Sequence, residues 1–223
     1  MKTMNNIKGL LFTVIALFAL TNVSNAAGIG GVYVEVGTSA VGSELDGKVV
    51  ETASTPNETS TGQVGKTAVT TSYGLGFMTD RSRKVGLDVG YMINPGSAKI
   101  KSDTTQGGGE VTFEITDSTD YYLAPMINIT EDASLFVKFG KAKSDLKIVG
   151  DVTKLNSMEG DTLALGTVMS WGSNLYIRTE AGKTKYDGLK VVGLGTAGGV
   201  AATTTVTADP TVHYGKIAIG YKF

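Results

Sequence analysis

The chain has 223 residues, and its 20 Lys and Arg residues are nearly balanced by 21 Asp and Glu residues. This balance argues against a nucleic-acid-binding protein, which would carry a clear basic excess. Cysteine is absent, which excludes a disulfide framework, and the 30 glycines predict tight turns or strands in which side-chain bulk is excluded.

The N-terminal segment has the pattern of a secretory signal peptide. Two lysines precede an apolar run at residues 10–20, and small residues stand three and one positions before a cut after Ala26. A retained membrane anchor is the alternative, but a membrane helix needs about 20 apolar residues and this run is shorter. We therefore expect a signal peptide over 1–26 and a mature domain over 27–223 that works outside the cytoplasm.

The mature chain shows repeated two-residue alternation and no helical periodicity of useful length. In the clearest segment Val85 and Leu87 face one way, whereas Gly86 and Asp88 face the other. The segments that alternate in this way are 31–37, 69–78, 85–93, 120–129, 135–142, 163–171, 175–182 and 216–223. Their number, eight, is even, as a closed antiparallel barrel in the bacterial outer membrane requires.

The connections between these segments alternate strictly between short and long. The short ones are 79–83, 130–133 and 172–174, and the long ones are 38–66, 94–118, 144–160 and 187–211. Transmembrane barrels have short periplasmic turns and longer outer loops, so both chain ends are expected on the periplasmic side. Because 110–116 and 146–152 have a strand-like pattern, the barrel wall is expected to continue beyond the membrane.

The apolar face of the alternation is predicted to contact lipid. A soluble barrel would expose a face rich in Lys, Glu and Thr, but the second face here is rich in Gly, Ala and Ser, as a narrow lumen needs. Strands of about ten residues, rising ~3.3 Å each and tilted ~40°, span about 25 Å, which is the expected apolar band. Aromatic residues lie near the predicted strand ends, as interfacial rings do: Tyr91, Phe77, Trp171, Tyr221 and Phe223.

Charged side chains on the inward face form the main candidate site. This lumen charge network comprises Glu35, Asp88, Asp120, Lys138, Arg178, Glu180 and Lys216. Unpaired charges in a confined interior are costly, so their near balance predicts paired networks that fill the barrel. A selective pore or proton path is the functional alternative, but the small strand number favours a plug of salt bridges.

Two other features suggest chemistry but do not carry it. The sequence from Gly193 to Gly198 spells the dinucleotide fingerprint G-x-G-x-x-G, which works only between a strand and a helix, and we interpret it as a loop tip. His213 is the single histidine, so a histidine-rich metal site is excluded. The lipid A deacylases, which are also eight-stranded barrels, place a serine two residues after their histidine. Gly215 occupies that position here, so the nucleophile is missing and we expect no catalytic residue. We also expect no cofactor and no metal.

The whole mature chain resembles the small OmpA/OmpX/Opa-like outer-membrane barrel family. Two stretches carry this resemblance: 163–178, with a Gly-bearing strand, a tight turn and an inward Arg, and 216–223, which ends the chain. The second is similar to the assembly signal of the family, formed here by Tyr221 and Phe223, although Ala218 stands where Gly is usual. The resemblance implies an all-β, eight-stranded, antiparallel up-and-down transmembrane barrel.

The leading functional hypothesis is a non-enzymatic barrel of the bacterial outer membrane that supports the envelope and displays its outer loops. A small porin-like channel is the first alternative, and an adhesin or host-binding protein, which rests on family analogy alone, is the second. The expected partners are outer-membrane lipid and lipopolysaccharide, and during biogenesis the barrel-assembly machinery and periplasmic chaperones. No nucleic-acid partner is expected.

Overall fold

The structure is a computed structural model that describes residues 30–51, 58–79, 83–101, 112–149, 157–197 and 200–223. The predicted signal peptide, with Ala26, lies outside the described residues. Within the described ranges, no helix combines the length and the apolar character needed to span a membrane.

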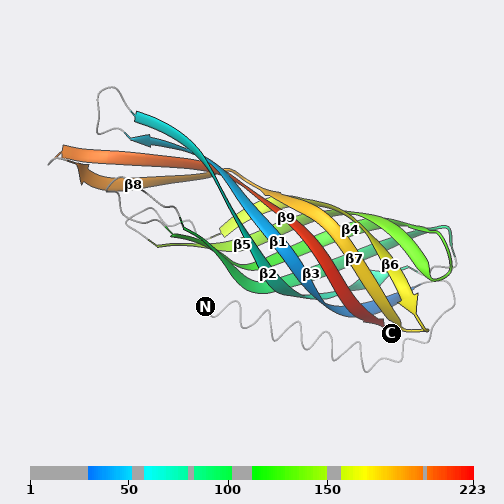
Figure 1. The fold of residues 1–223 in the computed structure, drawn as a ribbon. Coiled ribbons are helices and arrows are strands. Elements are labelled where there is room, and N and C mark those ends of the chain that lie inside the picture. The colour runs from blue at the N-terminus through cyan, green and yellow to red at the C-terminus, as the bar shows by residue number, and fades with distance from the viewer. Residues whose placement is uncertain (1–29, 52–57, 80–82, 102–111, 150–156, 198–199) are drawn as a thin grey trace.

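The described chain is all β-structure. Its strands are β1 (Gly31–Glu51), β2 (Glu58–Met78), β3 (Val85–Lys101), β4 (Thr112–Asn128), β5 (Ala133–Val149), β6 (Ser157–Trp171), β7 (Leu175–Tyr186), β8 (Leu189–Ala197) and β9 (Val200–Lys222). They form one antiparallel sheet in the order β1-β2-β3-β4-β5-β6-β7-β9, and β9 pairs back onto β1. The sheet is therefore a closed eight-stranded barrel, and the predicted fold class is confirmed (Figure 1). The additional strand, β8, pairs with β9 alone.

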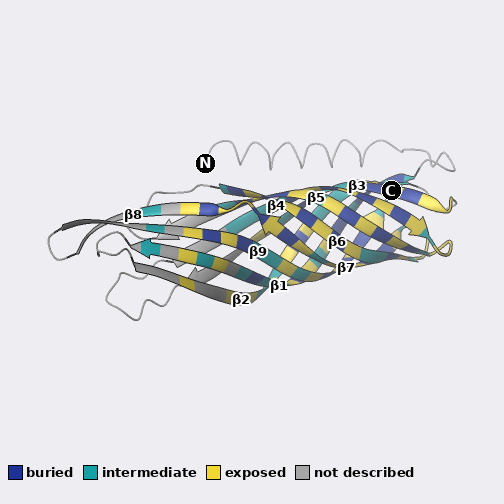
Figure 2. Ribbon diagram, turned by 90° about the horizontal axis from the view of Figure 1, so that it is seen from above, coloured by how far each residue is buried: buried dark blue, intermediate teal, exposed yellow. Residues whose placement is uncertain are grey.

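The predicted division into two faces is also confirmed. Along β7 exposed and buried residues alternate, with Thr179 outward and Arg178 and Glu180 inward. Figure 2 shows the same alternation of buried and exposed residues on the other strands of the barrel. Large apolar side chains on the outside include Leu165 and Val69, which are 66% and 78% exposed. An apolar exterior around a closed sheet fits a hydrocarbon solvent, in which every backbone polar group must be paired within the protein.

The segments expected as long loops are largely strands. β1 and β2 each have 21 residues and stay paired from Gly31↔Met78 to Glu51↔Glu58, so the expected 38–66 loop is a hairpin with a link at 52–57. A membrane strand needs only 9–11 residues, and about half of this hairpin therefore lies beyond the membrane. The expected continuation of the wall is confirmed for 112–116 and 146–149, which pair between β4 and β5.

The barrel wall divides between β2 and β3. Pairing between these strands ends at Tyr73↔Ile93, whereas β1 and β2 continue together. Directly after Ile93 the register of β3 with β4 shifts between Asn94 and Ser97, around Pro95. Proline has no backbone N–H for a ladder, and a bulge bends its strand, which explains why β3 leaves β2 here.

The β8–β9 hairpin lies beyond the barrel end (Figure 1). It contains residues 193–197 of the G-x-G-x-x-G pattern, which pair with residues 200–204 of β9. The interpretation of this segment as a loop tip is therefore wrong. Residues 193–197 belong to β8, which is an edge strand paired with β9. A dinucleotide site needs a strand followed by a helix, whereas this segment is a strand of the β8–β9 hairpin.

The opposite barrel end carries the short connections. β2 and β3 are linked by 79–84, β4 and β5 by 129–132, and β6 and β7 by 172–174, as the alternation of link lengths predicts. The C-terminus lies at this end, where Phe223 N donates to Val32 O at 2.9 Å. Short turns mark the periplasmic side of such barrels, so the extended hairpins lie on the extracellular side.

Candidate functional site

The candidate site is the lumen charge network. All seven predicted residues point into the barrel and are buried: Glu35, Asp88, Asp120, Lys138, Arg178, Glu180 and Lys216. They come from β1, β3, β4, β5, β7 and β9, which are six of the eight barrel strands. Two-residue alternation places each side chain inward, and barrel closure brings strands that are distant in sequence within contact distance.

Arg178 organises one half of the network. Its Nη2 donates to Asp88 Oδ2 at 2.6 Å, and its Nη1 donates to the Tyr122 hydroxyl at 3.2 Å. Its Nε lies 3.0 Å from Glu35 Oε2, an ion pair without hydrogen-bond geometry. The guanidinium also lies 5.2–6.0 Å from the ring centres of Tyr33, Tyr122, Phe136 and Tyr176. The positive charge of the guanidinium is thus balanced by two carboxylates, and cation–π contacts with the aromatic rings stabilise it further.

Two lysines organise the other half. Lys138 Nζ lies 2.6 Å from Asp120 Oδ2 and 3.0 Å from Glu180 Oε1. Lys216 Nζ lies 3.0 Å from Glu35 Oε1 and 3.5 Å from Glu180 Oε2, and it also contacts Met92 Sδ at 3.3 Å. Lys216 therefore joins the Arg178 half to the Lys138 half through two different carboxylates.

The seven charges form one continuous chain in which acids and bases alternate. The order is Asp88–Arg178–Glu35–Lys216–Glu180–Lys138–Asp120. Each base lies between two acids, so no cation is left uncompensated, and the chain ends on a carboxylate at both sides. Removal of a partner from a buried pair strands a charge and costs about 3–5 kcal/mol. The arrangement therefore favours a single packing of the six strands.

Tyrosine hydroxyls complete the network, and the sequence prediction omitted them. Tyr33 donates to Asp88 Oδ1 at 2.8 Å, Tyr176 donates to Glu35 Oε2 at 3.1 Å, and Tyr214 donates to Glu180 Oε1. Tyr33 also shares a hydrogen bond with the Tyr122 hydroxyl. The sequence did contain a signal for these tyrosines. In the two-residue alternation Tyr33 lies on the same inward face as Glu35, and Tyr176 lies on the same face as Arg178.

Glycines on the inward face make the room for these rings. A Cβ added at Gly90 would lie 2.5 Å from the Tyr122 ring, and one at Gly220 would lie 2.1 Å from the Tyr176 ring. Both distances are far below an ordinary van der Waals contact. A large inward aromatic residue on one strand is therefore matched by an inward glycine on another strand, which explains part of the high glycine content.

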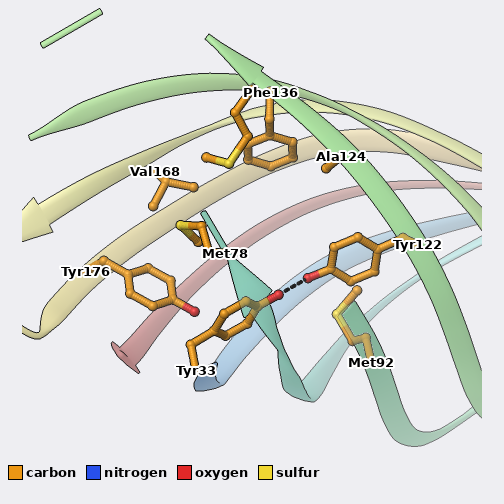
Figure 3. Close-up of a cluster of buried hydrophobic side chains, with 9 residues drawn as sticks. Tyr33, Met78, Met92, Tyr122, Ala124, Phe136, Val168 and Tyr176 are labelled. Carbon is orange, nitrogen blue, oxygen red and sulfur yellow. Dashed lines mark hydrogen bonds between the residues drawn. The ribbon is translucent and has the colours of Figure 1, made fainter. Parts of the chain in front are cut away.

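The network separates two other regions of the lumen. Toward the periplasmic turns the interior is filled by apolar side chains, among them Met78, Phe136 and Val168 (Figure 3). Met126 belongs to the same cluster. Toward the extracellular side lies a cavity of about 100 Å³, which reaches Asp120 and Lys216. Its lining mixes hydroxyl-bearing residues such as Ser39 and Thr70 with apolar residues such as Val41 and Val212.

The remaining residues considered in the sequence lie apart from the network. His213 is outward, and its Nε2 lies 3.9 Å from Glu44 Oε2. Tyr221 and Phe223, the predicted assembly signal, pack edge to face on the outer wall with ring centres 5.1 Å apart. The part of the chain that the structure describes contains no cluster of three or more metal-ligating side chains.

A closed barrel with an apolar exterior, a filled lumen and short turns at one end defines a class of protein. The chain is a β-barrel protein of the bacterial outer membrane. Its fold is that of the small OmpA/OmpX-like barrels.

Solved structures of other outer-membrane proteins are similar to this chain. OprG of Pseudomonas aeruginosa is 14% identical over 87% of this chain and 97% of its own, with a TM-score of 0.53. Ail of Yersinia pestis is 12% identical over 87% and 99%, with a TM-score of 0.39, and the protease OmpT of Escherichia coli is 9% identical over 90% and 99%, with a TM-score of 0.47. No protein-family model and no curated protein sequence matches the chain. OprG has a TM-score above 0.5, and at 14% identity its likeness to this chain extends to the fold and not to an activity.

Proposed function

We propose that this protein is a non-enzymatic outer-membrane barrel that stabilises the envelope and displays an extracellular β-structure. The observation that carries this proposal is the filled lumen. Asp88, Lys138 and Arg178 have no exposed surface, and they lie across the barrel interior rather than along an open path. A barrel filled by paired charges is suited to a rigid support and poorly suited to conduction.

The extracellular extension supports the display role. The β1–β2 hairpin and the β8–β9 hairpin flank each other through the β1–β9 pairing, which runs as far as Glu51↔Thr204. Together they form a projecting four-stranded sheet in the order β2-β1-β9-β8 (Figure 1). Such a sheet is more than barrel closure requires, and it presents ordered backbone and side chains to the exterior.

The outward histidine does not support an enzymatic role. His213 lies on the barrel wall, its cross-strand neighbours are Lys183 and Gly42, and Gly215 stands where the deacylases carry serine. A histidine base needs a nucleophile within hydrogen-bond distance, and neither Gly42 nor Gly215 has a side chain that could serve as the serine-like nucleophile of the deacylases.

Surface labelling of single-cysteine variants tests the display role directly, since the chain has no cysteine of its own. Lys48→Cys places a thiol on an exposed residue of the extended hairpin, and Ser173→Cys places one in the exposed β6–β7 turn. We expect a membrane-impermeant maleimide to label the first variant on intact cells and the second only after lysis. Labelling of Ser173→Cys but not Lys48→Cys on intact cells would refute the proposal.

A small pore is the second candidate, and the extracellular cavity favours it. This cavity lies on the extracellular side of the network and is bounded by Lys216 and Asp120, which are the groups that an entering ion would meet. Planar-bilayer recording separates the two functions. A display barrel gives no steady conductance, whereas a pore conducts and its conductance changes on Asp88→Asn or Arg178→Gln.

A further inference from the structure

A groove of about 660 Å³ lies in the outer wall of the barrel, on the face that contacts lipid. Its floor is one cross-strand row of small outward residues, Ala181 on β7, Gly215 on β9 and Ala40 on β1. The same row continues to large apolar residues on both sides, Leu165 on β6 and Val69 on β2. A Cβ added at Gly215 would meet nothing within 4 Å, so the groove is open and not filled by neighbouring side chains.

The groove ends at two polar residues on its extracellular side. Lys183 on β7 and His213 on β9 are cross-strand partners in the next row, and both are exposed. Within the described residues Lys183 forms no ion pair, whereas Lys138 and Lys216 each contact two carboxylates. Lys183 is therefore a cation available to a ligand.

The neighbouring residues place this polar end at the edge of the membrane. The row of Lys183 also contains Leu163, which is 46% exposed on the apolar exterior. One row further out the exterior becomes charged, because Lys141 and Asp161 form an exposed ion pair at 2.6 Å. A change from apolar to charged side chains marks the level of the lipid headgroups.

We propose that the groove binds an acyl chain of lipid A, and that Lys183 holds a phosphate of the same molecule. An apolar groove in contact with lipid takes a hydrocarbon chain, and a cation at the headgroup level takes an anion. The extended hairpins put this end of the groove in the outer leaflet, where lipid A is the phosphate-bearing lipid. A second barrel would present a convex wall, which fits a hollow floored by small side chains less well than a single acyl chain does.

Native mass spectrometry of the folded, detergent-solubilised protein tests the proposal, with lipid A, dephosphorylated lipid A and phosphatidylglycerol as the three probes. We expect the protein to retain lipid A in preference to the other two. Lys183→Gln should weaken retention roughly fivefold, because a lysine beside anionic lipid contributes an interaction of about that size. Ala181→Leu should also weaken retention, because its side chain fills the groove floor.

Two matched variants control for charge and bulk. Lys190→Gln removes an exposed lysine from β8, and Thr71→Leu adds bulk to the outer wall on β2 outside the groove. Both should retain lipid A as the unmodified protein does, and a heat-dependent shift in gel mobility confirms that each variant is folded. Equal retention of lipid A by all four variants would overturn the site. Equal retention of dephosphorylated lipid A would overturn the phosphate contact, and preference for phosphatidylglycerol would overturn the choice of lipid.

Discussion

Arg178 on β7 and Asp88 on β3 form an ion pair at 2.6 Å across the full width of the barrel, and neither has any exposed surface. The two residues are 90 positions apart in the sequence. Such a contact forms only when the barrel has closed, because β3 and β7 lie on opposite sides of the sheet order. The pair therefore links the packing of the lumen to the completion of the fold.

Loss of the Arg178 charge should destabilise the barrel strongly. Arg178→Gln leaves the carboxylates of Asp88 and Glu35 without their shared cation, at a cost of about 3–5 kcal/mol. Urea unfolding in lipid vesicles, followed by gel mobility, measures this change. The double variant Arg178→Gln/Asp88→Asn should recover part of the loss, and Lys185→Gln, which changes an exposed lysine, should have little effect. Equal stability of Arg178→Gln and Lys185→Gln would contradict a structural role for the network.

Removal of one inward hydroxyl should have a smaller but measurable effect. Tyr33→Phe deletes the donor to Asp88 Oδ1 and the contact with the Tyr122 hydroxyl. A buried acceptor that loses its partner costs about 1–3 kcal/mol. Tyr121→Phe is the matched control, because Tyr121 is outward and 61% exposed. The same unfolding measurement should separate the two variants, and a larger loss for the control would contradict the assignment of faces.

An added side chain at Gly90 should disrupt packing of the lumen. Its Cβ would lie 2.5 Å from Tyr122 and 2.7 Å from the Tyr33 hydroxyl, so Gly90→Leu must displace both rings. Overpacking typically costs about 1–3 kcal/mol, and occasionally more. The neighbouring Val89→Leu points to lipid and should be tolerated. The yield of heat-modifiable barrel after refolding compares them, and tolerance of Gly90→Leu would show that the lumen can expand.

A charge on the outer wall should impair membrane insertion. Leu123 is 46% exposed on β4 among other outward apolar residues, and an arginine there costs roughly 2–4 kcal/mol toward the middle of the bilayer. Thr61→Arg makes the same change at an exposed position of the β1–β2 extension. We expect Leu123→Arg to fold less efficiently into lipid vesicles than Thr61→Arg. Equal efficiencies would argue that the exterior does not face lipid.

The sequence predicted the barrel well because its main signal is local. Alternation with a period of two assigns each side chain to one face without knowledge of its partners. That is why Glu35 and Arg178 could be placed inside, and Leu123 outside, before any strand was paired. The extended β1–β2 hairpin was predicted less well. Residues 58–72 of β2 are rich in Thr, Ser and Gly, so their strand character depends on pairing with β1.

The sequence by itself determined the alternation, the number of membrane strands and the set of charges that enter the lumen, since each depends on neighbouring residues alone. Only the tertiary structure decided which acid meets which base. Lys216 contacts Glu35 because β9 closes onto β1 with Glu35 opposite Gly220, and a different closing register would give it another partner. The tertiary structure also decided that Ala181, Gly215 and Ala40 line up as one groove. Register between distant strands arises from the closure of the whole sheet, and no local pattern encodes it.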